Sequence, residues 1–307
     1  MFPVIPENVQ IEISNRCNLQ CPLCPKGRNE ITRNNLDMDI GIFKDILSKL
    51  SEYDPKIQLW NYGEPFLHHN IHEIIKSIDQ TFTNCSISTN GHVMTDELAK
   101  LVVESGITEI IFAIDGLTQN TYEQYRRGGS LELVLSNLEK IIEQKRKANS
   151  NITITVQFLI LKHNFSEISK LGEFFYPIGV DQIKAKSVML MDNKSDVELA
   201  KIAKKYLYLD YPGERYAITD NQLSAKGEPT DECPVIENSF VITTDGEVLP
   251  CCWDYKSEYP LSSYEKWLQI KRMVNSGKPP EMCNKCPIRY NHDFSWEWDK
   301  VPGVIYK

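Results

Sequence analysis

The sequence has no long hydrophobic run and no excess of basic residues. No stretch approaches about 18 uninterrupted apolar residues, and the N-terminus lacks the basic segment and apolar run of a signal peptide. We therefore expect a cytoplasmic protein that does not associate with membranes. The formal net charge of −8 gives no electrostatic reason to expect a nucleic-acid partner. A small or peptidic substrate is the simpler expectation.

Internal repeats and low-complexity tracts are also absent, and the chain instead alternates strand and helix patterns. Aliphatic or β-branched runs predict six strands, near Val9–Ser14, Lys56–Trp60, Asn84–Thr89, Glu109–Asp115, Ile152–Leu161 and Asp181–Val188. Helical spacing of apolar residues predicts helices over Asp39–Leu50, Ile71–Ile78, Thr95–Glu104 and Leu131–Ala148. Such βα units predict an α/β fold with a parallel sheet, and six of them predict a partial (β/α)6 barrel.

The pattern divides the chain into four predicted segments. These are a barrel over residues 1–191, a bridging segment over 192–232, a small cysteine-rich unit over 233–290 and a tail over 291–307. The bridge has one short helical pattern and a polar stretch with prolines and glycines. In the small unit, Asp245-Gly246 separates two apolar runs and predicts a β-hairpin over residues 240–249.

The nine cysteines are unevenly distributed. Three lie between residues 17 and 24, five lie between residues 233 and 286, and Cys85 stands alone within a predicted strand. Cytosolic thiols are kept reduced, so a disulfide framework is a poor explanation for this clustering. The pattern indicates metal or redox chemistry.

Cys17, Cys21 and Cys24 follow the first predicted strand directly. Parallel α/β folds gather their chemistry at the carboxyl ends of strands, which is where this loop is expected. Three thiolates ligate only three irons of a [4Fe–4S] cluster, leaving the fourth iron open for another ligand. A zinc knuckle is the alternative, but it needs a fourth ligand that no nearby cysteine or histidine supplies.

The Cys-x₃-Cys-x₂-Cys spacing resembles the radical S-adenosylmethionine (SAM) superfamily. In that family the open iron chelates the amino and carboxylate groups of SAM, and an electron from the cluster releases a 5′-deoxyadenosyl radical. The resemblance implies SAM and a SAM-binding [4Fe–4S] cluster as cofactors, and a flavodoxin- or ferredoxin-type electron donor. Leu23 stands where the family more often has an aromatic residue beside the adenine.

Further segments resemble the SAM pocket of the family. Asn61-Tyr62-Gly63-Glu64-Pro65 resembles its Gly-Gly-Glu-Pro motif, with Tyr62 in place of the first glycine. The resemblance implies that these residues contact the SAM amino group, that Ser88, Asn90 and Asp115 face the ribose, and that an arginine lies near the SAM carboxylate. Arg126 and Arg127 are both candidates for that arginine, and the sequence does not choose between them.

The second set of cysteines supplies four thiolates. Seventeen residues separate Cys233 from Cys251, and Cys283 and Cys286 form a Cys-x₂-Cys pair. Four thiolates fully ligate a second [4Fe–4S] cluster, although a zinc ribbon uses the same donors. The arrangement resembles the opening of a SPASM domain. Because no cysteine follows Cys286, the match is to the shorter twitch domain, which implies one auxiliary cluster.

Cys252, directly after Cys251, is a spare thiol. In one interpretation it is only a small buried residue. In the other it returns a hydrogen atom to a substrate radical, because an S–H bond is weaker than a substrate C–H bond. That second role makes Cys252 the catalytic residue of an epimerase.

A twitch domain with one cluster favours a dehydrogenase. The expected reaction oxidises a secondary alcohol of a sugar or aminocyclitol-like small molecule, with the auxiliary cluster as electron acceptor. Epimerisation through Cys252 is the first alternative, and maturation of a peptide substrate is the second. A non-catalytic iron–sulfur or zinc protein is the alternative from a different class.

Overall fold

The computed structural model describes residues 7–34, 36–190, 195–211, 213–284 and 286–290. The predicted tail over residues 291–307 lies outside the described residues. So do residues 191–194, where the barrel was expected to give way to the bridging segment.

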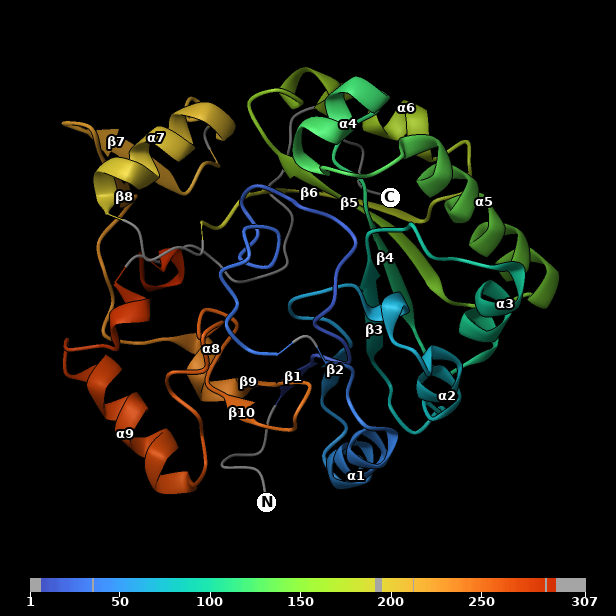
Figure 1. The fold of residues 1–307 in the computed structure, drawn as a ribbon, viewed down its shortest axis with the longest axis horizontal. Helices are drawn as coiled ribbons and strands as arrows, with labels where there is room; N and C mark the ends of the chain where they lie inside the picture. The colour runs from blue at the N-terminus through green and yellow to red at the C-terminus, as the bar shows by residue number, and fades with distance from the viewer. Residues whose placement is uncertain (1–6, 35, 191–194, 212, 285, 291–307) are drawn as a thin grey trace.

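A curved and mostly parallel sheet organises the fold (Figure 1). Its eight strands lie in the order β10-β9-β1-β2-β3-β4-β5-β6, and each strand from β1 to β6 is parallel to the next. The first six are β1 (Asn8–Ile11), β2 (Lys56–Gln58), β3 (Cys85–Thr89), β4 (Glu109–Ala113), β5 (Thr153–Ile160) and β6 (Gln182–Ser187). All six coincide with predicted strands, and the α/β partial barrel is confirmed.

Helices cover the outer side of this sheet (Figure 1). They are α1 (Ile40–Leu50), α2 (Ile71–Lys76), α3 (Asp96–Glu104), α4 (Gln119–Tyr125), α5 (Leu131–Ala148) and α6 (Leu171–Phe175), with 3₁₀ turns η1 (Pro65–Leu67) and η2 (Phe165–Lys170). The side chains of Asp39, Thr95, Thr118 and Ser130 accept hydrogen bonds from free backbone N–H groups where α1, α3, α4 and α5 begin. Helix α4 has seven residues and was not predicted.

The two faces of the sheet differ in polarity. Along β5, Ile154, Val156 and Phe158 are fully buried in the apolar core beneath the helices, whereas Gln157 lines a cavity on the inner face. Strands of a parallel sheet are usually apolar at every position, because other parts of the protein pack on both faces of the sheet. Alternation in this chain therefore indicates a barrel whose lumen is hollow and polar.

The predicted hairpin is present as β9 (Ser239–Ile242) and β10 (Val248–Leu249). It does not stand apart from the barrel, because β9 pairs in parallel with β1 and extends the same sheet. The remaining C-terminal elements are α8 (Pro234–Asn238), α9 (Tyr264–Asn275), η3 (Glu281–Cys283) and η4 (Pro287–Tyr290). The cysteine-rich unit thus continues the barrel through backbone hydrogen bonds.

The bridging segment is more ordered than expected. It contains α7 (Asp196–Tyr206) and an antiparallel hairpin of β7 (Tyr216–Thr219) and β8 (Gln222–Ala225). Asp220 and Asn221 form the turn with φ angles of 52° and 61°. Aspartate and asparagine tolerate this left-handed conformation, which two-residue hairpin turns require. The hairpin was not predicted.

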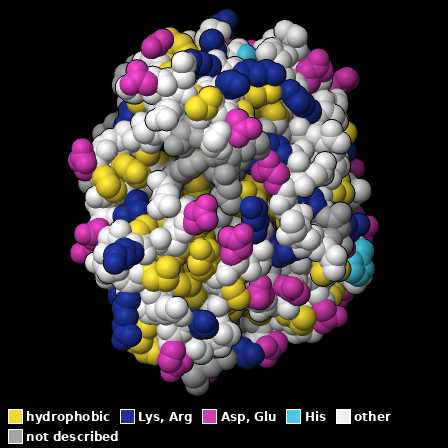
Figure 2. Space-filling view, turned by 60° about the vertical axis from the view of Figure 1, so that its left-hand side comes forward, with side chains coloured by type: hydrophobic (Ala, Val, Ile, Leu, Met, Phe, Trp, Pro, Cys, Tyr) yellow, Lys and Arg dark blue, Asp and Glu magenta, His cyan; other side chains and the backbone are white. Residues whose placement is uncertain are grey.

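Within the described residues, no helix combines the length and apolarity needed to cross a membrane. On the described part of the face drawn in Figure 2, acidic and basic side chains are interspersed. This distribution differs from the single-sign basic surface that nucleic-acid binding favours.

The pairing of β9 with β1 makes Ile242 part of the barrel core, where its side chain is 1% exposed. We expect Ile242→Ala to lower the free energy of unfolding by about 2–4 kcal/mol, because it leaves a cavity in that core. Leu133, 42% exposed on α5, is the control, and its replacement by alanine should change stability by less than about 0.5 kcal/mol. Urea unfolding measures both. Equal stability of the two variants would contradict a shared core.

Candidate active site at the ends of the barrel strands

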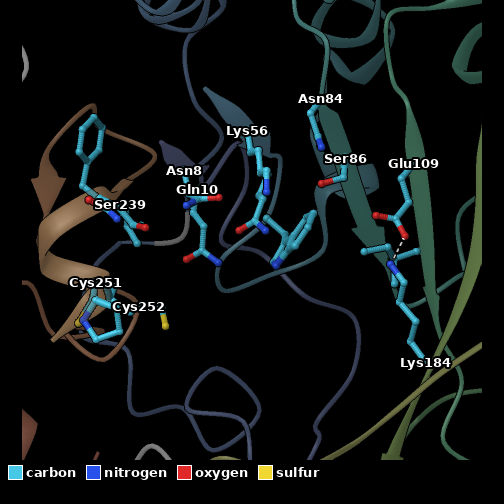
Figure 3. Close-up of a pocket in the computed structure, with 18 residues that line it drawn as sticks. Asn8, Gln10, Lys56, Asn84, Ser86, Glu109, Lys184, Ser239, Cys251 and Cys252 are labelled. Carbon is cyan, nitrogen blue, oxygen red and sulfur yellow. Dashed lines mark hydrogen bonds and ion pairs between the residues drawn. The ribbon is translucent and has the colours of Figure 1, made fainter. Parts of the chain in front are cut away.

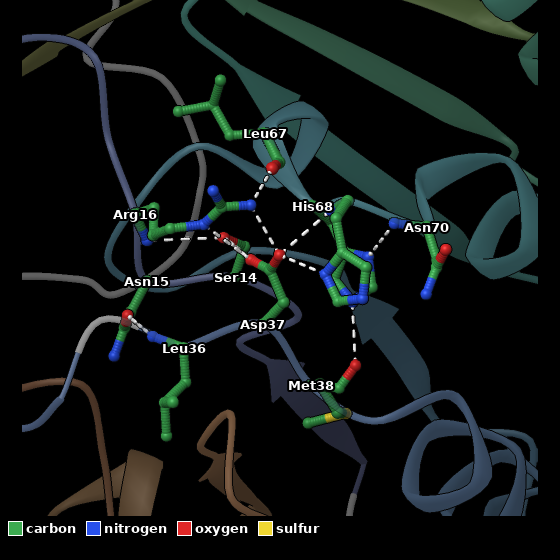
Figure 4. Close-up of polar contacts among 10 residues, drawn as sticks. Ser14, Asn15, Arg16, Leu36, Asp37, Met38, Leu67, His68 and Asn70 are labelled. Carbon is green, nitrogen blue, oxygen red and sulfur yellow. Dashed lines mark hydrogen bonds and ion pairs between the residues drawn. The ribbon is translucent and has the colours of Figure 1, made fainter.

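The loop that leads from β1 to the first cysteines is anchored by Asp37 (Figure 4). The carboxylate of Asp37 accepts hydrogen bonds from Ser14 Oγ at 2.7 Å and Arg16 Nε at 3.0 Å. The Arg16 guanidinium also donates to the carbonyl of Leu67 at the end of η1. His69 contacts the same carboxylate through its backbone N–H and Nδ1. These bonds fix the start of the cysteine loop to the turn after β2.

Asp37, His68 and His69 bring three potential metal-ligand atoms within 4.8 Å of one another. Both ring nitrogens of His68 are already used, however. Its Nδ1 accepts from the backbone N–H of Asn70 at 3.0 Å, and its Nε2 donates to the carbonyl of Met38 at 2.8 Å. His69 stacks on His68 with a centroid distance of 5.0 Å. The group is therefore a structural anchor.

The turn after β2 is held by the buried carboxylate of Glu64. Its oxygens accept from the backbone N–H groups of Phe66 at 3.1 Å and Asn90 at 2.6 Å, and from Thr89 Oγ1 at 2.7 Å. Burial raises the pKa of Glu64 to about 7, although these hydrogen bonds oppose the shift. Glu64 thus joins the ends of β2 and β3.

Gly63 brings the same turn against the cysteine loop. Its φ angle is +110°, and a Cβ at this position would lie 2.4 Å from the carbonyl oxygen of Ser14. Only glycine fits both the left-handed backbone and the close approach. The Gly-Glu pair of the motif is thus explained by backbone packing in this chain.

A cavity of about 310 Å³, here called the motif cavity, collects most of the residues that the sequence singled out. It is lined by Cys17, Cys21, Cys24, Tyr62, Gly63, Glu64, Ser88, Asn90 and Arg126. Pro65, Asp115 and Arg127 do not line it. The three cysteines, here called the motif cysteines, therefore share one cavity with the ends of β2 and β3.

The structure distinguishes the two candidate arginines. Arg126 Nε lies 2.5 Å from Asp115 Oδ2, and its Nη1 lies 3.9 Å from Cys21 Sγ. Burial would lower the pKa of Arg126, but the Asp115 carboxylate raises it well above its usual value. Arg127 points elsewhere and donates to the hydroxyl of Tyr206 at 2.9 Å. Asp115 therefore lies behind Arg126 and positions it.

The second set of cysteines also comes together. Cys233, Cys251, Cys283 and Cys286, here called the auxiliary cysteines, lie in the segment that follows the bridge. The pKa of the Cys251 thiol is raised first by burial and then by the nearby thiols of Cys252 and the other auxiliary cysteines. Residues separated by up to 53 positions in sequence thus approach one another closely enough to interact electrostatically.

The spacing of the sulfurs tests which group they suit. A tetrahedral zinc ion with Zn–S bonds near 2.3 Å places its sulfurs about 3.8 Å apart. Within the described part of the chain, no set of three cysteine sulfurs lies within 4.8 Å. Neither set of described sulfurs is drawn together to the spacing of a zinc site, and thiolates alone are the usual ligands of a [4Fe–4S] cluster.

A second cavity of about 590 Å³, here called the lumen cavity, occupies the inner face of the barrel (Figure 3). Its polar lining includes Asn8, Gln10, Gln58, Asn84, Ser86 and Ser239. Glu109 and Lys184 form an ion pair across β4 and β6 with a distance of 2.5 Å. Cys251 and Cys252 lie on the opposite side of the cavity. Trp60 borders both cavities, so they are adjacent.

Several polar residues that line the motif cavity were not identified from the sequence, among them Gln157 and Lys186. Burial and the neighbouring Arg215 guanidinium lower the pKa of Lys186 to about 8. Both residues are only partly buried and alternate with buried neighbours along β5 and β6. That period of two was the available signal, because it marks side chains that point into the barrel.

A family model described as the radical SAM superfamily matches residues 11–175, which is more than half of the chain. This range includes the motif cysteines and the strand ends around them. The chain belongs to the radical SAM superfamily. The resemblance seen in the sequence is confirmed, and the family implies SAM and a SAM-binding [4Fe–4S] cluster.

The relatives of this radical SAM enzyme are named for different activities. A Pyrococcus furiosus "tungsten-containing aldehyde ferredoxin oxidoreductase cofactor-modifying protein" is 27% identical over 265 residues, covering 78% of this chain and 69% of that protein. The Bacillus subtilis "sporulation killing factor maturation protein SkfB" is 24% identical, covering 80% of this chain and 60% of that protein. The chain thus spans less than two thirds of SkfB.

Among solved structures, Streptococcus suis SuiB bound to S-adenosylmethionine superposes with a TM-score of 0.62. The match covers 93% of this chain and 72% of SuiB at 12% identity. At this identity the comparison shows the shared fold. It extends beyond residues 11–175 and so includes C-terminal parts of the radical SAM enzyme.

The Asp37 anchor predicts a pH dependence of stability. Burial opposes ionisation, but hydrogen bonds from His69, Ser14 and Arg16 hold the pKa of Asp37 well below its usual range. The stabilisation is therefore complete above about pH 4, the unfolded pKa, and is lost as pH falls towards the folded pKa. In the metal-free chain we expect Asp37→Asn to cost about 1–3 kcal/mol at pH 7 and less at pH 3.

Urea unfolding at a series of pH values measures this difference. Asp45→Asn is the control, because Asp45 pairs with Lys49 on the surface with both side chains at least half exposed. Its effect should stay small at every pH. A cost for Asp37→Asn that grows on acidification would contradict the anchor role of the carboxylate.

Proposed function

We propose that this radical SAM enzyme oxidises a secondary alcohol of a polar small molecule, of the sugar or aminocyclitol type. The observation that carries the proposal is the polar lumen cavity. Cys251 lines it directly, and Trp60 joins it to the motif cavity, which the motif cysteines line. Amide and hydroxyl side chains donate and accept hydrogen bonds, and a substrate rich in hydroxyl groups matches them.

The cofactors are assigned by the two sets of thiols. The motif cysteines would hold the SAM-binding cluster, and the auxiliary cysteines would hold a second [4Fe–4S] cluster in a twitch domain over residues 233–290. When bound, SAM with the first cluster supplies a 5′-deoxyadenosyl radical, and the second cluster supplies an electron acceptor. A flavodoxin- or ferredoxin-type protein is the proposed reductant.

In this proposal, different residues of the motif cavity bind different groups of SAM. The backbone of Tyr62 and Gly63 faces the amino group, Ser88 and Asn90 face the ribose, and Arg126 binds the carboxylate. Glu64, Pro65 and Asp115 act indirectly, since they shape the turn or hold Arg126. Arg127 has no direct part in this proposal, because its guanidinium is bonded to Tyr206.

Lys186 is the proposed proton acceptor for the substrate hydroxyl. It lies at the end of β6, and its side chain lines the motif cavity with Gln157 and Arg215. With a pKa of about 8, a substantial fraction of its amine is neutral at slightly alkaline pH. A neutral amine accepts a proton as a general base.

We expect Arg126→Lys to weaken SAM binding about tenfold or more, because lysine offers no planar fork to a carboxylate. Arg127→Lys is the matched control and should change the affinity by less than about threefold. Calorimetric titration of SAM into anaerobically reconstituted protein measures both. A larger loss in the Arg127 variant would reverse the assignment.

The oxidation itself is tested with candidate sugars and aminocyclitols deuterated at their carbinol carbons. After anaerobic reconstitution and reduction, we expect one deuterium in 5′-deoxyadenosine for each ketone formed. Absence of 5′-deoxyadenosine with both clusters present would instead favour a non-catalytic iron–sulfur protein. Deuterium transfer without ketone would refute dehydrogenation while retaining hydrogen abstraction.

Epimerisation is the second candidate, and the position of Cys252 favours it. Cys252 lines the lumen cavity beside Cys251 (Figure 3). A thiol there is placed to return a hydrogen atom to a substrate radical. In D₂O an epimerase leaves one solvent deuterium on the inverted carbon, and Cys252→Ala should abolish inversion while 5′-deoxyadenosine still forms. Near-normal inversion in that variant would dismiss the donor role.

A peptide substrate is favoured by a different observation, the name of the relative SkfB. The amide side chains of the lumen cavity are also able to pair with a peptide backbone. The same deuterium assay, run with peptides synthesised with deuterated α-carbons, distinguishes this substrate class from the small molecules.

A further inference from the structure

Trp253 is a buried residue whose polar atom has no hydrogen-bond partner among the described residues. Its side chain is 5% exposed, and its indole Nε1 is shielded from solvent. Leaving such a donor unsatisfied in the interior is costly, because the donor gives up its hydrogen bond to water and gains none in return. A group that accepts this hydrogen bond is therefore expected to occupy the site in the functional protein.

The surroundings of Trp253 indicate which acceptor that is. The indole packs in a small cluster with Val235, Cys286 and Ile288. Partly buried Met189, Cys233, Cys251 and Cys252 pack against this cluster. These side chains are apolar or carry sulfur, and three of them belong to auxiliary cysteines. Sulfur is thus the side-chain acceptor that the neighbourhood offers.

We propose that the Trp253 indole donates a hydrogen bond to a sulfur of the auxiliary cluster and thereby raises its reduction potential. The inference rests on the proposed function, because it requires that the auxiliary cysteines hold a [4Fe–4S] cluster. The sulfur is either a cysteine thiolate or a bridging sulfide, since both carry negative charge.

The direction of the effect follows from electrostatics. Reduction adds a negative charge to the cluster, and a hydrogen bond to sulfur stabilises the more negative state. The bond therefore favours the reduced cluster. A higher potential makes the auxiliary cluster a better acceptor for the electron that alcohol oxidation releases. Trp253 is a tuning residue in this scheme and does not touch the substrate.

Trp267 supplies a matched control in the same unit. Its side chain is 7% exposed, and it lies on α9. Its Nε1 donates to the backbone carbonyl of Ile236 at 2.9 Å, so its hydrogen bond is already satisfied within the protein. Removing either indole costs similar packing, but only Trp253 is proposed to contact the cluster.

The experiment uses the full chain with Cys17, Cys21 and Cys24 replaced by alanine, so that only the auxiliary cluster assembles. Trp253→Phe and Trp267→Phe are introduced into this parent. Potentiometric titration followed by electron paramagnetic resonance measures the midpoint potential. We expect Trp253→Phe to disfavour reduction about tenfold, a downward shift of about 59 mV for one electron, and Trp267→Phe to leave the potential unchanged.

An unchanged or higher potential in Trp253→Phe would overturn the proposal. Water entering the space left by the indole would raise the potential, so hydration does not mimic the expected result. A parent that binds no four-iron cluster would refute the auxiliary-cluster assignment itself, and iron analysis reveals this separately.

A spectroscopic readout decides the case if Trp253→Phe fails to assemble its cluster. In D₂O, the reduced parent should show coupling of the cluster spin to an exchangeable deuteron. Growth on tryptophan labelled with ¹⁵N at the indole nitrogen shows whether an indole N–H contributes this coupling, and the same measurement with Trp267→Phe in the parent excludes Trp267. Absence of any such coupling in a parent with an intact cluster would refute the hydrogen bond.

Discussion

Strand β1 is the element on which the arrangement of both cysteine sets depends. It pairs with β2 on one side and with β9 on the other, and both pairings are parallel. The chain leaves β1 directly into the loop of the motif cysteines, and it leaves β9 through β10 towards Cys251. Two sets of cysteines more than 200 residues apart in sequence are thereby attached to neighbouring strands of one sheet.

The alternation of side chains along those strands gives the sheet its two roles. Apolar residues on the outer face bury themselves under the helices and stabilise the fold. Polar residues on the inner face leave a hollow that hydrogen-bonding ligands can enter. A closed eight-stranded barrel instead fills its interior with branched aliphatic side chains. In this chain the open, mostly parallel sheet surrounds a polar cavity, which is the proposed place of the reaction.

Local patterns in the sequence were sufficient to predict the six barrel strands, the helices α1, α2, α3 and α5 and the clustering of the cysteines, but not α4 or the twelve-residue α9. Hydrophobic spacing and ligand spacing are short-range signals, and each stands in one continuous segment. The pairing of β9 with β1 was not predictable in this way, because it joins segments that no local pattern connects. The β7–β8 hairpin was missed because its strands are only four residues long, too short for a clear alternation of apolar and polar residues.

The same limit applies to the candidate site: its motifs were predictable from short segments, but contacts between distant segments were not. The motif predicted that one of two adjacent arginines enters the SAM pocket, but the choice depends on how α4 ends. There the buried Asp115 holds Arg126 against the cavity, and Tyr206 of the bridging segment holds Arg127 away from it. Trp253 and Lys186 belong to no recognised motif, and only the packing around them gives them a role.

Tyr62 stands where the family motif has its first glycine. Its side chain limits the relative movement of two parts of the molecule. Its hydroxyl donates to the carbonyl oxygen of Cys252 at 2.7 Å, and its ring meets that of Tyr255 edge-on at 6.1 Å. These contacts brace the turn after β2 against the segment that carries Cys251. Electron transfer slows steeply with distance. A brace that limits the relative movement of the two cysteine sets therefore keeps the distance between the motif cavity and the auxiliary cysteines constant, which is the distance that the proposed transfer of an electron from substrate to auxiliary cluster depends on.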